Sequence, residues 1–331
     1  MNSNLIVSED IEKKVIKLFR KRLPQTYAYL EGAIGGAYKE NQDLVFLIVG
    51  RTGFGKSNFG ALLSVACTAI ARRITKNENI HFNFAQDASW SAVDFLLMLK
   101  PIANEVIKSL TGFSDEEIKQ FVNKGIFKEL LDLFDSEEAI NARFNRLKEL
   151  KKKYSYRVKW LDEAQDIYSQ QFMDIVNREL TKIMAGIREL HFTYIFCLPS
   201  PLLLHPYIRK ERVNTMFFTF PVPEGGERGT APRYVAVYDL PRYYRVILDK
   251  EENIGALMIS PTKFLERYPP AFIEGEIPLF PQDCKEWKLY CIMKMLSTAR
   301  LPLRGLEKIE EKRLGVKKVA KKPATLDDLY E

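Results

Sequence analysis

Residues 50–57 of this chain read Gly50-Arg51-Thr52-Gly53-Phe54-Gly55-Lys56-Ser57, directly after the apolar run 44–49. The G-x-x-x-x-G-K-S spacing is typical of a phosphate-binding loop between a strand and a helix. Its glycines let backbone N–H groups point inward at a phosphate, and the following helix adds the positive end of its dipole. The pattern predicts that Lys56 reaches the β and γ oxygens of a nucleotide and that Ser57 holds Mg²⁺. The competing interpretation is a glycine-rich turn without a ligand.

A pair of acids follows the apolar residues 158–161, where the chain reads Asp162-Glu163-Ala164-Gln165-Asp166. Adjacent acids at the end of a buried strand look like a Walker B segment. Asp162 is expected to orient the water shell of Mg²⁺, and Glu163 is placed to activate the attacking water. An ordinary exposed strand end is the alternative, and the phosphate loop upstream favours the catalytic interpretation.

Two later strands end or begin with candidate phosphate contacts. The predicted strand 192–198 is followed by Ser200, a polar side chain at the position from which many nucleotide-hydrolysing sheets sense the γ-phosphate. Arg209 and Arg212 precede the predicted strand 213–220, and guanidinium groups stabilise charge on transferring phosphoryl oxygens. These arginines are expected to reach a phosphate in the same or the next subunit, and ion pairing with nearby acids is equally open.

The composition is that of a soluble globular protein. The chain has 331 residues, of which 46% are hydrophobic, and this is enough to bury a full core. Its apolar runs are far shorter than the roughly 18 residues of a membrane span, and its first residues lack the layout of a signal peptide. We therefore expect a cytoplasmic location and no membrane span. The 4 cysteines and 3 histidines are too few and too scattered for a disulfide framework or a metal site built from them.

The net charge of +7 is concentrated in two clusters. Residues 143–159 hold eight Lys or Arg against one acid, and residues 300–322 hold nine against three, so the rest of the chain is net acidic. Basic clusters of this kind suit a polyanion such as nucleic acid, because cationic side chains displace the counterions of its phosphates. A solvated helix face is an equally open interpretation of either cluster.

Apolar periodicity and breakers predict an α/β fold with four parts. These are an N-terminal helical segment, a P-loop core with a helical insertion, an extension that completes the core, and a basic tail. Within them we expect a loop or broken helix at 27–41, a second core strand at 79–84 and a β-hairpin of strands 234–238 and 243–248. The bounds of the parts are 1–41, 42–222 with the insertion at about 89–154, 223–299 and 300–331.

The order of these features resembles the additional-strand (ASCE) P-loop ATPases. Within that class the chain looks most like the HerA/FtsK-type DNA pumps, which include genome-packaging and conjugation motors of viruses and mobile elements. The resemblance covers residues 42–222 and rests firmly on residues 50–57 and on Asp162-Glu163. It implies a RecA-like sheet of order 5-1-4-3-2 and a homo-oligomeric ring of six subunits with ATP and Mg²⁺ between neighbours. It also implies double-stranded DNA in the centre, a portal, capsid or secretion partner, and the host cytoplasm as location if the source is viral.

Carried over residue by residue, the resemblance gives Lys56 and Ser57 the phosphate and Mg²⁺ contacts. It gives Asp162 and Glu163 the metal-orienting and water-activating roles, and Arg212, or less closely Arg209, the role of the arginine near the late strand. The sequence departs from the class in two respects. Those pumps usually carry Gln where this chain has Ser200, and the C-terminal part shows no convincing winged helix.

Other classes of P-loop protein are alternatives to a DNA pump. An assembly or export ATPase of the zonular-occludens type would act on protein. A slow ATP-dependent structural switch would have little use for the water-activating carboxylate of Glu163. A two-domain helicase needs a second RecA-like domain, for which residues 223–331 are too short. A small GTPase would carry N-K-x-D, and nucleotide kinases tend to lack adjacent acids.

Overall fold

The computed structural model describes residues 6–124, 136–162, 170–221, 232–249, 254, 258 and 260–296. The chain divides into two compact units, Met1–Lys288 and Leu289–Glu331. All the strands, and with them the phosphate loop, belong to the first unit, which is described below. The predicted basic tail at 300–331 lies outside the described residues.

The first unit alternates helices and strands along most of its length. In chain order its elements are α1 (Glu9–Arg22), α2 (Pro24–Glu40), β1 (Leu44–Val49), α3 (Lys56–Thr75), α4 (Phe84–Asp87), β2 (Ala88–Ser89), α5 (Ala92–Thr111), α6 (Asp115–Lys124), α8 (Glu137–Tyr154), β3 (Val158–Asp162), α9 (Gln170–Gly186), η3 (Arg188–Leu190), β4 (Thr193–Leu198), η4 (Pro201–Leu203), α10 (Pro206–Glu211), β5 (Thr215–Pro221), β6 (Arg233–Tyr238), α11 (Leu240–Ile247), α13 (Pro261–Arg267) and β7 (Phe272–Glu274).

One mixed sheet of seven strands, ordered β2-β3-β4-β1-β5-β6-β7, organises this unit. Its first five strands are parallel, and β6 and β7 are antiparallel additions next to β5. The predicted five-strand order is therefore wrong for the sheet as a whole. Read from β5 to β2, the parallel part runs 5-1-4-3-2, so the difference lies in the two strands added beyond β5.

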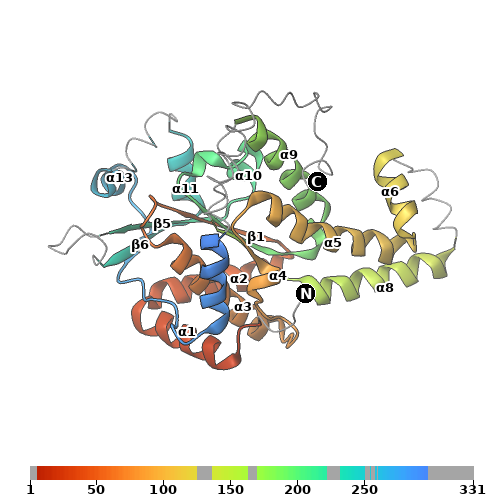
Figure 1. The fold of residues 1–331 in the computed structure, drawn as a ribbon, viewed down its shortest axis with the longest axis horizontal. Helices are drawn as coiled ribbons and strands as arrows, with labels where there is room; N and C mark the ends of the chain where they lie inside the picture. Colours follow the sequence, from red (N-terminus) through yellow and green to blue (C-terminus); the bar gives the residue numbers. More distant parts are fainter. Residues whose placement is uncertain are drawn as a thin grey trace, which may run out of the picture. The chain divides into compact units, whose positions relative to one another are not determined.

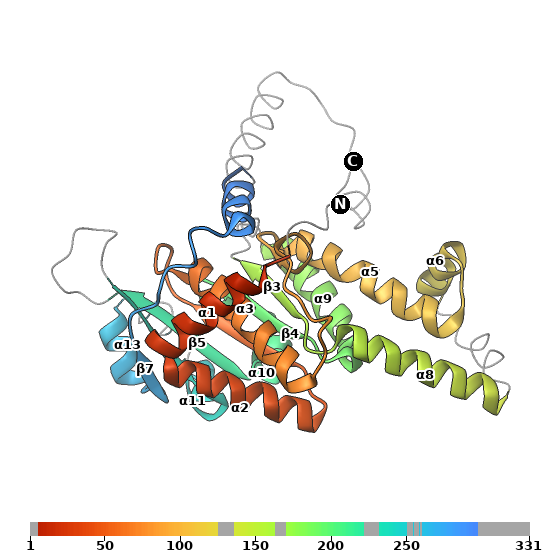
Figure 2. The same ribbon diagram turned by 90° about the horizontal axis from the view of Figure 1, so that it is seen from below.

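Helices cover both faces of the sheet (Figure 1). On one face α3 packs on β3 and β4, and α1 and α2 pack on α3. The opposite face carries α5, α9 and α11, with α8 packed against α5 (Figure 2). Helices on both faces bury the central strands completely, and every residue of β1 and β4 is buried.

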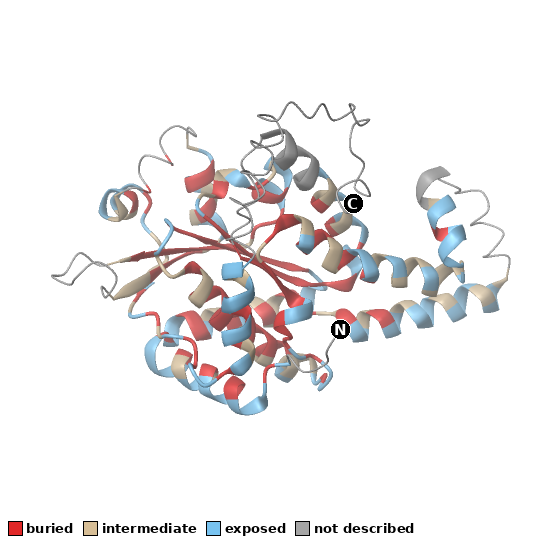
Figure 3. Cartoon of the chain, in the orientation of Figure 1, coloured by how far each residue is buried: buried red, intermediate tan, exposed pale blue. Residues whose placement is uncertain are grey.

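The predicted helical insertion is present as α5, α6 and α8. Serines accept backbone hydrogen bonds at the starts of two of these helices, Ser91 from Asp94 N and Ser136 from Ala139 N. Figure 3 shows that α6 and most of α8 expose much of their surface, whereas the strands are almost entirely buried. Within the insertion, α5 therefore belongs to the core, with Phe95, Leu96 and Leu99 buried, whereas α6 and much of α8 lie at its exposed side.

Three sequence-based expectations about elements are wrong. Residues 27–40 belong to the continuous helix α2, which Asn41 caps, because packing against α3 outweighs the cost of its glycines. Residues 79–84 form no strand, and Asn83 makes only an isolated bridge to Ile6. The second half of the predicted hairpin is α11, which Asp239 caps by accepting from Arg242 N at 3.3 Å.

Candidate functional site

The loop 50–57 follows the carboxyl end of β1 and leads directly into α3. Its three glycines have positive φ angles of 153° at Gly50, 88° at Gly53 and 85° at Gly55. Residues other than glycine rarely adopt such backbone angles. Helix α3 begins at Lys56, and Gly55 at its N-cap has no side chain that could cap it. In a loop of this kind the first N–H groups of the following helix can bind an anion.

Gly50 is required for a further reason, which is the closeness of β5. A Cβ atom at Gly50 would lie 2.5 Å from the backbone oxygen of Thr219 and 2.7 Å from its Oγ1. These distances are shorter than any tolerated contact, so β5 fixes where the loop starts. The exposed tip of the loop, Arg51 to Gly53, then stands clear of the sheet.

The Lys56 side chain is buried, with 3% of its surface exposed. Its Nζ donates to the backbone oxygen of Gly50 at 2.8 Å and to that of Arg51 at 3.2 Å. The ammonium thus lies across the mouth of the loop, bonded to carbonyl oxygens of the same loop. A phosphate oxygen is a stronger acceptor for an ammonium than a neutral carbonyl, so this lysine is placed to exchange these bonds for a ligand.

Ser57 and Asp162 meet from distant parts of the sequence. Ser57 Oγ donates to Asp162 Oδ1 at 2.9 Å, and Asp162 is the last residue of β3 and fully buried. Hydroxyl and carboxylate oxygens in this arrangement are ligands that Mg²⁺ accepts directly or through water. The site therefore fits a Mg²⁺-nucleotide, with the phosphates at residues 50–57 and the metal at Ser57 and Asp162. In the described ranges no group of three or more His, Cys, Asp or Glu is gathered at one place.

Two further candidate residues, Glu163 and Ser200, follow β3 and β4 in the sequence. Glu163 lies outside the described residues. Ser200 caps η4, because its Oγ accepts from Leu202 N at 3.3 Å. Cys197, in the strand that precedes Ser200, is fully buried beneath α3, where its Sγ accepts from Trp160 Nε1 at 3.2 Å. Its place under α3 is a packing position.

Arg212 lies at the opposite edge of the sheet from the loop. It precedes β5 and pairs with Asp43, which precedes β1, and both side chains are buried. Burial alone would lower the pKa of Arg212, but the Asp43 charge and the hydrogen bonds that Arg212 makes to Asp43 and Tyr207 raise it above its usual value. The six residues of β1, about 20 Å, separate this pair from the loop. This position contradicts the expectation that Arg212 reaches a phosphate in its own subunit, and burial also argues against its reaching a neighbour's.

Arg209 is also buried, on the sheet face opposite α3. Its Nη1 donates to the backbone oxygen of Leu202 at 3.2 Å, and its own backbone oxygen accepts from Tyr243 Oη at 2.8 Å. These contacts join α10 to η4 and α11. They give Arg209 a structural place in the face that carries α11, and not the phosphate contact expected from the sequence.

Two residues beside the loop were not identified from the sequence. Arg233, at the start of β6, passes directly over Gly55. Asn58, in the first turn of α3, bonds residues 278 and 280 through its side-chain amide. The predicted strand 234–238 stopped one residue short of Arg233, and no local signal in the sequence indicates that this strand pairs with β5.

The predicted basic cluster at 143–159 is largely committed to contacts within the chain. Lys159 is buried and pairs with Asp87 at 2.7 Å, and Lys151 pairs with Glu189 at 2.8 Å. Arg143 Nε donates to the backbone oxygen of Leu110 at 2.9 Å. These pairings favour the structural interpretation for much of the cluster.

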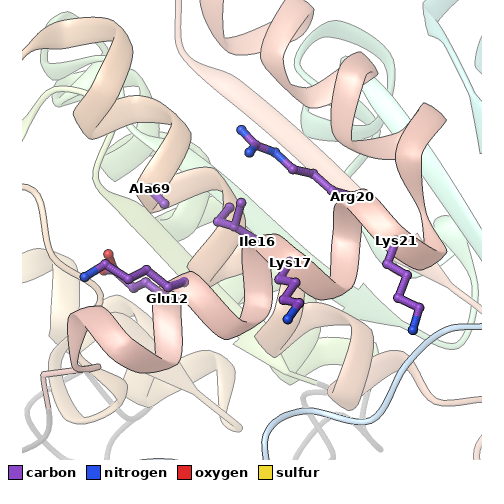
Figure 4. Close-up of a pocket in the computed structure, with 7 residues that line it drawn as sticks. Glu12, Ile16, Lys17, Arg20, Lys21 and Ala69 are labelled. Atoms are coloured by element: carbon purple, nitrogen blue, oxygen red, sulfur yellow. The ribbon is translucent and has the colours of Figure 1, made fainter.

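A separate basic groove lies between α1 and α3, with a volume of about 540 Å³ (Figure 4). Lys17 and Lys21 stand one helical turn apart and point the same way, whereas Arg20 turns toward Tyr27 and donates to its Oη at 3.4 Å. The floor includes Ile16 and Ala69. We call this the α1 groove.

No helix in the described part of the chain combines the length and the apolar character needed to cross a bilayer. The chain matches no protein-family model, and no curated protein matches it in sequence.

Proposed function

We propose that this chain is an ATPase of the additional-strand P-loop class that uses ATP hydrolysis to move double-stranded DNA. Genome packaging and transfer of a mobile element are the processes that need such a motor. One observation carries the proposal: Lys56, Ser57 and Asp162 converge at the carboxyl edge of the parallel strands, around a glycine loop that opens onto the start of α3. The run 5-1-4-3-2 within the sheet supports a RecA-like core.

In this proposal the chain binds a nucleotide with groups that are already close together. The N–H groups at the start of α3 cradle the phosphates, and Lys56 leaves the carbonyl oxygens of Gly50 and Arg51 for a phosphate oxygen. Ser57 and Asp162 hold Mg²⁺, which neutralises charge on the phosphate oxygens when it is bound. Glu163, the next residue after Asp162, takes a proton from the attacking water.

ATP turnover of three proteins tests the hydrolytic part of the proposal. We expect Lys56→Ala to lose nucleotide binding, because it removes the ammonium group that is placed to contact the phosphates. We expect Glu163→Gln to keep ATP binding and to lose turnover by roughly 100-fold or more, since it removes the base alone. Lys100→Ala, which removes an exposed lysine on α5, is the matched control and should leave turnover unchanged.

Turnover of Glu163→Gln at the wild-type rate would contradict this mechanism. Thermal melting of each variant separates loss of function from loss of folding. Stimulation of wild-type turnover by duplex DNA, weakening steeply with salt, is expected for a DNA motor. Its absence would favour an assembly or export ATPase acting on protein, and very slow turnover at saturating ATP would favour a structural switch.

The ring of six subunits belongs to the same proposal. The described part of the chain offers no arginine from the predicted pair to the loop, since Arg209 and Arg212 are both buried elsewhere. A neighbouring subunit that supplies a cation is therefore one way to complete the hydrolytic site. Mass measurement with and without ATP tests whether nucleotide drives ring formation.

A further inference from the structure

Arg233 reaches the phosphate loop because of the direction of β6. It is the first residue of this strand and pairs with Pro221, at the end of β5. Since β6 runs antiparallel to β5, its amino end lies at the edge where β1 and β5 have their carboxyl ends. An arginine far from the loop in sequence is thus brought to the edge of the sheet where the loop begins.

The side chain of Arg233 lies against the second glycine of the motif. A Cβ atom built on Gly55 would lie 2.8 Å from Arg233 Cδ, 3.6 Å from its Nε and 3.8 Å from its Nη1. The aliphatic stem therefore passes over the Cα atom of Gly55 with the guanidinium close by, and the residue is half-buried. A Cβ atom at this position would push the end of the Arg233 side chain away from the loop.

Residues 277–280, which we call the strap, hold Arg233 and the start of α3 together. Ile277 N donates to the backbone oxygen of Arg233 at 2.7 Å. Asn58 Nδ2 donates to the backbone oxygen of Pro278, and Asn58 Oδ1 accepts from Phe280 N, both at 2.8 Å. These three hydrogen bonds fix the strand that carries Arg233 relative to the first turn of α3, so the arginine is positioned before any ligand arrives.

The approach is from the flank opposite the metal-binding pair. In the sheet, β4 and β3 lie on one side of β1 and carry Asp162, whereas β5 and β6 lie on the other side and carry Arg233. Ser57 and Asp162 would hold Mg²⁺ on the β3 side, and Arg233 approaches the loop from the β5 side. Because a glycine loop of this kind cradles the α- and β-phosphates of a nucleotide, a side chain that lies against Gly55 is placed for the phosphates that ADP and ATP share.

We propose that Arg233 is a second cation of the nucleotide site and binds the diphosphate that ADP and ATP share. This inference rests on the proposed function. Two cations, Lys56 from the loop and Arg233 from β6, contact the phosphates together, and guanidinium groups suit phosphate oxygens because they can donate two parallel hydrogen bonds. Arg233 thus serves nucleotide affinity more than the hydrolytic step.

Titration of ADP and of ATP into wild-type protein and Arg233→Met tests this assignment. Methionine keeps an unbranched stem over Gly55 and removes the charge, so folding should be retained, as thermal melting can check. We expect the dissociation constants of ADP and ATP to rise together, by about tenfold or more, while kcat at saturating ATP changes by less than about threefold. Arg233→Lys should recover part of the affinity.

Arg22→Met is the matched control, because Arg22 is an exposed arginine that pairs with Glu276, close in sequence to the strap. Its nucleotide affinities should equal those of the wild type. An unchanged ADP affinity in Arg233→Met, with or without a loss of kcat, would overturn this inference and leave the proposed function standing. Wild-type protein that binds neither ADP nor ATP would overturn both.

Discussion

Gly60 and Gly36 are both glycines inside helices, but their surroundings differ. A Cβ atom at Gly60 in α3 would lie 2.7 Å from Trp160 Nε1 and 2.9 Å from Cys197 Sγ, whereas one at Gly36 in α2 would meet nothing within 4 Å. Gly60 therefore lets α3 approach β3 and β4 closely, and this approach places Ser57 next to Asp162. Gly36 has no such role among the contacts described.

Alanine at these two positions should have opposite effects on stability. Gly60→Ala forces Trp160 or the helix to move, so we expect the free energy of unfolding to fall by about 1–3 kcal/mol. Gly36→Ala should raise it by roughly 0.5–1 kcal/mol, because alanine loses less backbone entropy in a helix. Urea denaturation of the two variants measures both changes, and equal effects of the same sign would contradict the packing argument.

The candidate binding residues differ in how far the sequence reveals them. Lys56, Ser57 and Asp162 were identified because phosphate and Mg²⁺ chemistry fixes their residue types at short spacings. Arg212 was misassigned because its partner Asp43 lies far away in sequence, and only the parallel pairing of β1 and β5 brings the two together. Arg233 was missed for a similar reason, since an antiparallel strand order decides its place.

At the scale of elements, strands with continuous apolar runs were predicted well and mixed patterns were not. In the segment 79–84, Ile80 and Phe82 are buried on either side of the exposed His81, but Asn83 is buried as well, and among the described residues the segment has no strand partner beyond the bridge at Asn83. Burial periodicity does not by itself specify pairing. In α11, by contrast, the Asp239 cap and Pro241 at the helix start outweigh the strand-like aromatic residues.

The turn between α8 and β3 and the turn between η3 and β4 lie next to each other. Tyr156 and His191 occupy these turns with positive φ angles of 62° and 51°, and their rings stack at 6.2 Å. His191 is buried, and within the described structure neither ring nitrogen has a hydrogen-bond partner. Burial lowers the pKa of His191, and Lys151 lowers it further, while Glu189 and Asp43 act in the opposite direction.

These turns should make the protein sensitive to mild acid. Because the folded-state pKa of His191 is below that of an unfolded histidine, near 6.5, the unfolded chain binds more protons in this range. The stability contributed by neutral His191 is therefore present above about pH 6.5 and is lost as pH falls toward the folded-state pKa. His191→Asn, which tolerates the left-handed backbone, should flatten the dependence of unfolding free energy on pH between about 7.5 and 5.5.

His81→Asn is the control for this measurement, because His81 is exposed. It should retain the pH dependence of the wild type. If His191→Asn and wild type lose stability in parallel as pH falls, other groups are responsible for the acid sensitivity.

For the molecule as a whole, helix α3 borders both surfaces that the proposed motor needs. The proposed nucleotide site lies at the carboxyl edge of the parallel strands, with Lys56 as the first residue of α3, and the α1 groove lies over the same helix, with Ala69 among its lining residues. A polyanion bound in the groove would rest on the helix whose first turn belongs to the proposed nucleotide site.

Duplex DNA is the polyanion that the proposed function requires, and the α1 groove is a candidate contact for it. Reversing the two lysines that point the same way, in Lys17→Glu/Lys21→Glu, should weaken duplex DNA binding by roughly tenfold at 0.1 M salt, because two phosphate contacts are lost. The slope of log affinity against log salt should become shallower by about 2. ATP turnover without DNA should stay unchanged, since neither lysine approaches residues 50–57.

The control carries the same change in net charge at a different place, as Lys100→Glu/Lys119→Glu on the exposed surfaces of α5 and α6. A general loss of positive charge would weaken DNA binding equally in both double variants, whereas a local site is affected only by changes on α1. Fluorescence anisotropy with a labelled duplex at several salt concentrations distinguishes them. Equal slopes in the two variants would exclude the α1 groove as the DNA contact. The slope of log affinity against log salt is proportional to the number of phosphates that the protein neutralises.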